Sequence, residues 1–94
     1  LVVGSNTTEA HPIAALQIKK ALRRGATLVV VDPRRVDIAR RAHLHLQPRP
    51  GTNVAVLNGL MHVIRAEGLA DEAFIRERTE GFEALAEVLP AYTL

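Results

Sequence analysis

The chain has no cysteine and no tryptophan, and only 3% of its 94 residues are aromatic. Without cysteine, these residues supply no disulfide, no zinc thiolate and no ligand for an iron–sulfur cluster. No apolar run approaches the roughly 20 residues needed to span a bilayer. What remains is the composition of a globular domain, 48% hydrophobic and 23% charged.

The net charge of +2 conceals two halves of opposite sign. Residues 1–49 carry nine Lys and Arg against three acids, giving +6, whereas residues 50–94 carry three Arg against seven acids, giving −4. A basic half suits an anionic partner, either a phosphate-bearing cofactor or a nucleic acid. All three aromatic residues lie in the acidic half, so bases have nothing to stack on in the basic half, and we expect no nucleic-acid partner.

Turn residues and apolar periodicity divide the chain into alternating strands and helices. Strand-like runs are expected at residues 1–4, 27–31 and 43–46, and helices at about 12–24, 54–67, 71–79 and 82–89. Residues 36–42 fit a short helix or an irregular turn. The run 27–31 is continuously β-branched or leucine, which is typical of a strand covered on both faces. We predict an α/β, Rossmann-like three-layer fold with helices flanking a short parallel sheet.

Two further expectations concern packing and domain boundaries. The chain opens inside a strand-like run without an initiator methionine, so residues 1–94 are expected to form a single partial domain of a longer subunit. The first long helix should lie on the sheet through an apolar set made up of Ile13, Leu16 and Ala21, with Ala14, Ala15, Ile18 and Leu22 around them. The helix at 54–67 should bury a broad stripe comprising Val54, Leu57, Leu60, Met61 and Ile64.

Three polar loops each follow a strand-like run, at residues 4–11, 32–35 and 51–53. Loops after parallel strands emerge at one edge of a sheet, so we expect these segments to converge there. Gly4 permits close approach of a ligand, Asn6 offers an amide, and the Asp32 carboxylate can accept bonds from ribose hydroxyls or a guanine edge. The pattern predicts a nucleotide site. Because the Gly-x-Gly-x-x-Gly motif is missing, an ordinary nicotinamide or flavin site is disfavoured.

His43 and His45 fall on one face of the third strand-like run. Two histidines at this spacing could ligate a metal, but no third ligand accompanies them, so no metal site is expected. His11 and His62 are interpreted as ordinary helix-end or surface residues.

Four sequence blocks occur in a recognisable order: Gly-Ser-Asn-Thr-Thr-Glu-Ala-His-Pro at 4–12, Val-Asp-Pro-Arg-Arg at 31–35, Arg-Pro-Gly-Thr-Asn at 49–53 and Arg-Thr-Glu-Gly-Phe-Glu at 78–83. Together they resemble the molybdopterin-guanine-dinucleotide oxidoreductases of the dimethyl sulfoxide reductase type. The first block is most similar to the catalytic subunit of formate dehydrogenases. The alternatives to a formate dehydrogenase are a related member of the family, such as a nitrate reductase, and a non-catalytic nucleotide-binding module.

The resemblance implies a bis-molybdopterin guanine dinucleotide cofactor carrying Mo or W. The matching positions are Gly4, Ser5, Asn6 and Glu9 against one pterin guanine dinucleotide, Asp32, Pro33 and Arg34 at its guanosine end, and Gly51, Thr52 and Asn53 nearby. The family's metal-ligating Cys or selenocysteine, neighbouring His and substrate Arg match no position here, so no catalytic residue and no redox activity are expected in this chain alone. The resemblance also implies iron–sulfur clusters elsewhere in the parent protein and electron-transfer subunits. It implies no direct membrane contact and a cytoplasmic location, with the periplasm as the alternative.

Overall fold

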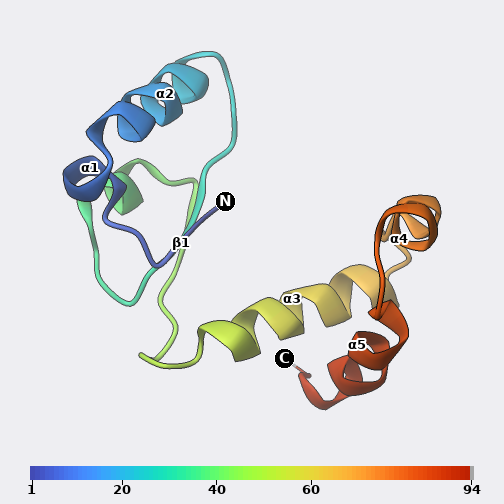
Figure 1. Ribbon diagram of the computed structural model, residues 1–94. Helices are drawn as coiled ribbons and strands as arrows, with labels where there is room; N and C mark the ends of the chain where they lie inside the picture. The colour runs from blue at the N-terminus through green and yellow to red at the C-terminus, as the bar shows by residue number, and fades with distance from the viewer. Residues whose placement is uncertain (94) are drawn as a thin grey trace. The chain divides into compact units, whose positions relative to one another are not determined.

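The computed structural model describes residues 1–93, which fall into two compact units, Leu1–Gly51 and a second beginning at Thr52 (Figure 1). Each unit is described on its own. The expectation of one partial domain over residues 1–94 stays a prediction. No helix within residues 1–93 is both long enough and apolar enough to cross a membrane.

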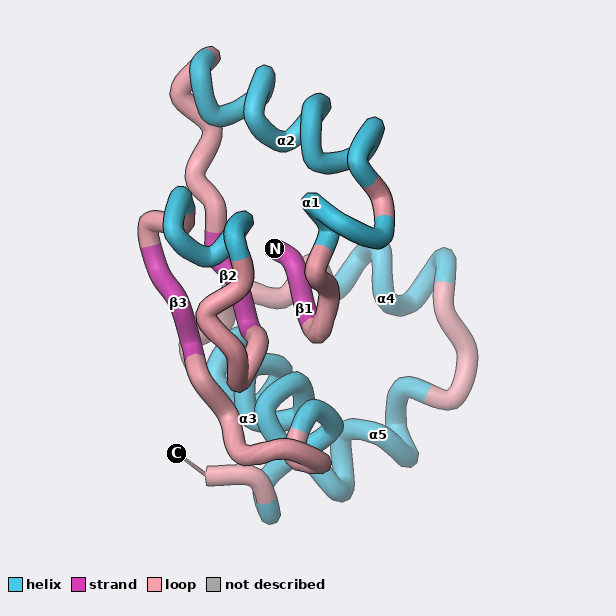
Figure 2. Tube along the Cα trace, turned by 90° about the vertical axis from the view of Figure 1, so that its left-hand side faces the viewer, coloured by secondary structure: helices cyan, strands magenta, loops and turns pink. Residues whose placement is uncertain are grey.

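The first unit is built on a three-stranded parallel sheet. Strands β1 (Val2–Val3), β2 (Val29–Val31) and β3 (Leu44–Leu46) lie in the order β1-β2-β3, so β2 is the central strand (Figure 2). Val31 is in register with Val3 on one side and with Leu46 on the other. The α/β fold with a short parallel sheet is confirmed, although each strand is shorter than its predicted run.

Helices connect the strands of this sheet. The segment between β1 and β2 contains α1 (Thr7–Ala10) and α2 (Pro12–Arg23), and the 3-10 helix η1 (Asp37–Arg41) lies between β2 and β3. Pro12 occupies the first turn of α2 and Gly25 follows its end at φ +91°, both as predicted. The sequence predicted only a loop where α1 forms. The amides of Ala10 and His11 close this short helix by bonding the carbonyls of Asn6 and Thr7.

The core of the first unit lies where β2 meets α2 and η1. Its buried residues are Leu28, Val30, Ile38 and Ala39, and Val2, Ile18, Leu22, Val36 and Ala42 pack against them. Val30 and Val31 are both buried although successive strand residues point to opposite faces, so the prediction that β2 is covered on both faces is confirmed.

The packing prediction for α2 is confirmed for one part of the apolar set and wrong for another. Ala15 is buried and Ile18 and Leu22 pack against the core, whereas Ile13 and Leu16 are 75% and 56% exposed in this unit. Residues three to four apart share a helix face, so the core covers only a narrow stripe of the predicted apolar surface.

The second unit is helical and comprises α3 (Asn53–Ala66), α4 (Glu72–Arg78), α5 (Phe82–Val88) and the 3-10 helix η2 (Leu89–Ala91), drawn in yellow to red in Figure 1. The side chain of Asp71 caps α4, as predicted, by accepting a 2.9 Å bond from the Phe74 amide. The predicted buried stripe of α3 is wrong in part within this unit, since Val54 is 67% and Leu60 44% exposed, whereas Met61 and Ile64 are partly buried. Short η2, with Leu89 buried, contacts α3, and it covers only part of the helix's apolar surface.

Candidate functional site

The loops that follow β1 and β2 begin side by side at the carboxyl edge of the sheet. The Gly4 amide donates to the Val31 carbonyl at 2.8 Å, and the Asp32 amide donates to the Leu46 carbonyl at 3.1 Å. Gly4 has φ +61°, a left-handed conformation that favours glycine. The predicted convergence of the first two loops is therefore present in this unit.

The loop after β1 holds one polar atom without a partner. Asn6 stands at the N-cap of α1, but its side chain makes no capping bond. Its Oδ1 is buried and has no hydrogen-bond partner within residues 1–93. The neighbouring Thr7 hydroxyl, by contrast, donates to Ser5 Oγ at 3.1 Å. A buried acceptor left unpaired costs about 1–3 kcal/mol, so this amide is suited to a ligand that brings an N–H or O–H donor.

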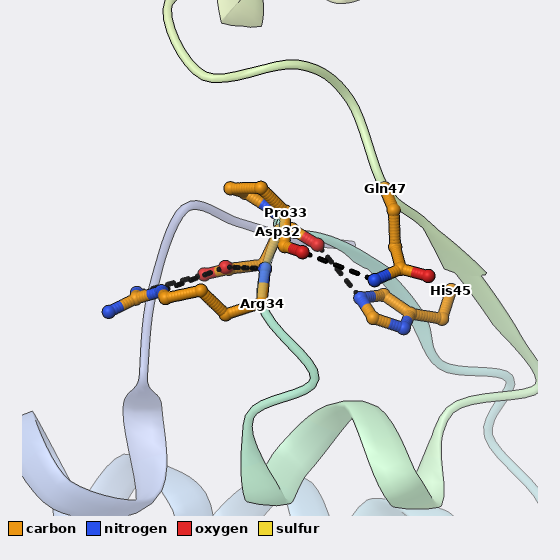
Figure 3. Close-up of polar contacts among 5 residues, drawn as sticks. All are labelled: Asp32, Pro33, Arg34, His45 and Gln47. Carbon is orange, nitrogen blue, oxygen red and sulfur yellow. Dashed lines mark hydrogen bonds and ion pairs between the residues drawn. The ribbon is translucent and has the colours of Figure 1, made fainter.

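The turn after β2 contains a closed ion pair (Figure 3). The Asp32 carboxylate is fully buried and accepts from Arg34 three times: from the main-chain amide at 2.8 Å, from Nε at 3.1 Å and from Nη2 at 3.2 Å. These side-chain bonds hold the pKa of Asp32 below its ordinary value, although burial acts in the opposite direction. The same bonds raise the pKa of Arg34, and the charge of Glu9, from the neighbouring loop, acts in the same direction.

This pairing changes the interpretation of Asp32. The sequence suggested that its carboxylate is free to accept bonds from a nucleotide, yet Arg34 already occupies and shields it. The Arg34 side chain is 64% exposed, so the guanidinium, not the carboxylate, is the accessible member of the pair. A guanidinium fixed on one side by a carboxylate still directs other N–H groups outward, toward phosphate or base acceptors.

Two residues that the sequence did not assign to the site hold the same turn from β3 (Figure 3). His45 Nε2 lies 2.8 Å from the Asp32 carbonyl oxygen, and Gln47 Nε2 donates to the Pro33 carbonyl at 3.1 Å. A carbonyl only accepts, so Nε2 of His45 carries the proton. The signal in the sequence was the alternation of His43, Leu44, His45 and Leu46, which places the two imidazoles on one face.

His43 also bonds β2, at its other end: its Nδ1 accepts from the Leu28 amide at 3.1 Å. The two histidines thus bond the main chain of the residues that flank the central strand, Leu28 before β2 and Asp32 after it. Within residues 1–93, no three His, Asp or Glu side chains gather in a way that could hold a metal ion.

The third predicted loop is divided between the two units. Gly51, at φ +84°, ends the first unit, and Thr52 is the N-cap residue of α3 in the second without making a side-chain capping bond. Asn53 is the first residue of that helix. Convergence of this loop with the other two stays a prediction.

Sequence comparison identifies relatives of nearly the whole chain. The sequence model of a family described as molybdopterin oxidoreductase matches residues 1–87. The alpha subunit of a formate dehydrogenase from Methanocaldococcus jannaschii is 48% identical over 93 residues, covering 99% of this chain and 14% of that protein. Formate dehydrogenase H of Escherichia coli is 44% identical over 92 residues, covering 98% of this chain and 13% of that protein.

A solved structure agrees with these sequence matches. Acetylene hydratase from Pelobacter acetylenicus superposes with a TM-score of 0.85 at 35% identity, over 98% of this chain and 13% of that one. The chain thus spans about 14% of the length of the first of these curated relatives. The family match covers both units of the structure, and the chain belongs to the molybdopterin oxidoreductase family.

Proposed function

We propose that this chain holds a pterin guanine dinucleotide within the catalytic subunit of a molybdenum- or tungsten-dependent formate dehydrogenase. The proposal is supported by one juxtaposition at the carboxyl edge of the sheet. A buried, unpartnered acceptor, Asn6 Oδ1, lies in the loop next to the turn that presents the exposed Arg34 guanidinium. Guanine nucleotides offer N–H donors on the base and acceptors on the base and phosphates, so they complement both groups.

The residues of this edge fit the cofactor that the family implies. Gly4 allows the main chain to approach a ligand closely, Asn6 accepts, and Arg34 donates. The full set proposed to hold the bis-molybdopterin guanine dinucleotide is Gly4, Ser5, Asn6, Glu9, Asp32, Pro33, Arg34, Gly51, Thr52 and Asn53, with the buried Asp32 carboxylate acting through Arg34.

When bound, the cofactor supplies the Mo or W centre at which formate is oxidised to CO2. This chain's own residues bind and orient the nucleotide end, as proteins generally do for redox cofactors. Residues outside this chain ligate the metal and contact the substrate. Iron–sulfur clusters and electron-transfer subunits of a cytoplasmic parent enzyme complete the proposal.

The test is to determine which nucleotide, pterin and metal the purified full-length subunit contains. Acid hydrolysis is expected to release guanine nucleotide together with pterin and stoichiometric Mo or W, and the loaded enzyme is expected to oxidise formate. Adenine nucleotide without pterin would instead identify a non-catalytic nucleotide-binding module. Pterin with guanine nucleotide in an enzyme that reduces nitrate and leaves formate unchanged would identify the nitrate reductase alternative.

A further inference from the structure

We infer that His45 is a positioning residue: its Nε2–H fixes the Asp32–Arg34 turn through the main-chain carbonyl of Asp32, and Gln47 assists through the carbonyl of Pro33. The inference rests on the proposed function, because this turn is one of the segments proposed to hold the guanine dinucleotide. His45 itself is not proposed to touch the cofactor.

The turn is held at every step by β3 and the residue that follows it. The Asp32 amide donates to the Leu46 carbonyl, the Asp32 carbonyl accepts from His45, and the Pro33 carbonyl accepts from Gln47. Beyond the last residue of a strand the sheet ladder no longer pairs main-chain groups, so side chains must do so. His45 and Gln47 extend the pairing of β2 with β3 past the end of the sheet.

The orientation of β3 supports a specific use for the imidazole. Leu44 and Leu46 are 50% and 41% exposed in this unit, whereas His45 between them is half-buried beside fully buried Asp32. A polar ring takes the more buried position while two leucines take the exposed ones. Burial of a polar group is favourable only when it is hydrogen-bonded, and here the bond goes to the turn.

A chain of bonds leads from His45 to the accessible charge of the site. His45 fixes the main chain of Asp32, and the Asp32 carboxylate fixes Arg34 through its amide, Nε and Nη2. Hydrogen bonds weaken steeply with misalignment, so a shift of the turn would misplace the guanidinium.

His43 provides a matched control on the same strand segment. It also makes one hydrogen bond to the main chain next to β2, but to the Leu28 amide at the amino end of the strand, away from the turn. His43→Leu and His45→Leu therefore remove the same side chain and one comparable bond each. They differ in which end of β2 loses a side-chain hydrogen bond: the amino end in His43→Leu and the carboxyl end in His45→Leu.

The experiment measures cofactor release from the full-length subunit. Purified wild type, His45→Leu, His45→Gln and His43→Leu are incubated, and guanine nucleotide in the filtrate is quantified after hydrolysis. Loss of one hydrogen bond corresponds to a change of about two- to tenfold, so His45→Leu is expected to release cofactor faster by about that factor. His45→Gln, which keeps an N–H at similar reach, should release it near the wild-type rate, as should His43→Leu despite a lower unfolding temperature.

Three results overturn the inference alone while wild type still yields guanine nucleotide: unchanged release from His45→Leu, equal acceleration in His43→Leu, or failure of His45→Gln to restore wild-type release. A wild-type subunit that yields no guanine nucleotide overturns the proposed function as well. If His45→Leu does not accumulate as folded protein, His45→Glu replaces it, because glutamate matches glutamine in size but brings no donor. Faster release from the Glu variant than from the Gln variant is then the expected result, and equal rates overturn the inference.

Discussion

Arg34 and Asp32, two residues apart, form a closed ion pair in which Nε and Nη2 of the guanidinium lie 3.1 and 3.2 Å from the two carboxylate oxygens. The carboxylate is buried and the guanidinium is exposed. The pair therefore presents a positively charged surface, although the sequence alone indicates the acid, Asp32, as the group that binds ribose.

This asymmetry predicts that Asp32 acts on the cofactor through Arg34. Asp32→Asn and Arg34→Gln should each accelerate cofactor release by about tenfold or more, since about tenfold is the lower end of the range for charge-assisted hydrogen bonds, and the double variant should release no faster than Arg34→Gln. Release of guanine nucleotide from the full-length subunit is the measurement. Additive effects in the double variant would show that the Asp32 carboxylate contacts the cofactor directly.

The lowered pKa of Asp32 predicts a pH window for stability. A carboxyl group whose pKa is depressed by folding stabilises the protein above its unfolded value, here close to 3.8, and this contribution disappears as the pH falls through the lower folded value. The difference in unfolding temperature between wild type and Asp32→Asn should stay constant from pH 5 to 7 and shrink below about pH 3.8. A difference that stays constant as the pH is lowered below 3.8 would contradict the assignment.

Asn6 predicts a separation between stability and binding. Its side chain makes no capping bond and its Oδ1 is unpartnered within residues 1–93, so Asn6→Ala should leave the unfolding temperature of the cofactor-free subunit unchanged or slightly raised. The same variant should release cofactor about tenfold faster. Ser5→Ala is measured alongside it for comparison, because Ser5 Oγ, unlike Asn6 Oδ1, already accepts a hydrogen bond from Thr7 within residues 1–93. A lowered unfolding temperature of the cofactor-free Asn6→Ala subunit would contradict the finding that Asn6 Oδ1 has no hydrogen-bond partner within residues 1–93.

Gly4 and Gly25 form a second matched pair. Both have positive φ, +61° and +91°, so alanine at either position is strained by about 1–2 kcal/mol. An added Cβ at Gly25 meets nothing within 4 Å, and Gly25 lies at the end of α2 rather than at the carboxyl edge. Both alanine variants should lower the unfolding temperature, but only Gly4→Ala should accelerate cofactor release. Equal release from the two variants would remove Gly4 from the site.

Asp71 predicts a local effect in the second unit. Removing its cap in Asp71→Ala should weaken α4 by about 1 kcal/mol, seen as roughly fivefold faster hydrogen exchange at the Phe74 amide. Glu72→Ala, one residue further along, keeps the cap and should exchange close to wild type. Cofactor release should be the same in both variants.

The parts of this fold that were predictable from sequence rest on local rules. Pro12, Gly25 and Asp71 mark helix ends through their own backbone or side-chain chemistry, so a single sequence suffices to place them. The β-branched run before Asp32 similarly identified β2. The edge at which Gly4 and Asp32 meet followed from the general geometry of parallel strands.

The parts that were not predictable depend on register and on which surfaces meet. Nothing local to His45 reveals that β3 pairs with β2 such that its ring reaches the Asp32 carbonyl. The ion pair of Asp32 with Arg34 was equally hidden, because the same two residues in an open turn would face solvent separately. For α2, periodicity gave the helix but not which of several apolar stripes packs, and Ile13 was assigned to the wrong side.

Pro33 lies between the two members of the ion pair, and its ring restricts φ, while its own carbonyl accepts from Gln47 and the carbonyl of Asp32 accepts from His45. The conformational entropy of this turn is therefore lost when the chain folds, before any nucleotide arrives. A ligand that meets an already ordered turn need not oppose roughly 1–2 kcal/mol of backbone ordering per residue. Folding of the sheet that supports this turn therefore lowers the ordering cost of binding the proposed nucleotide.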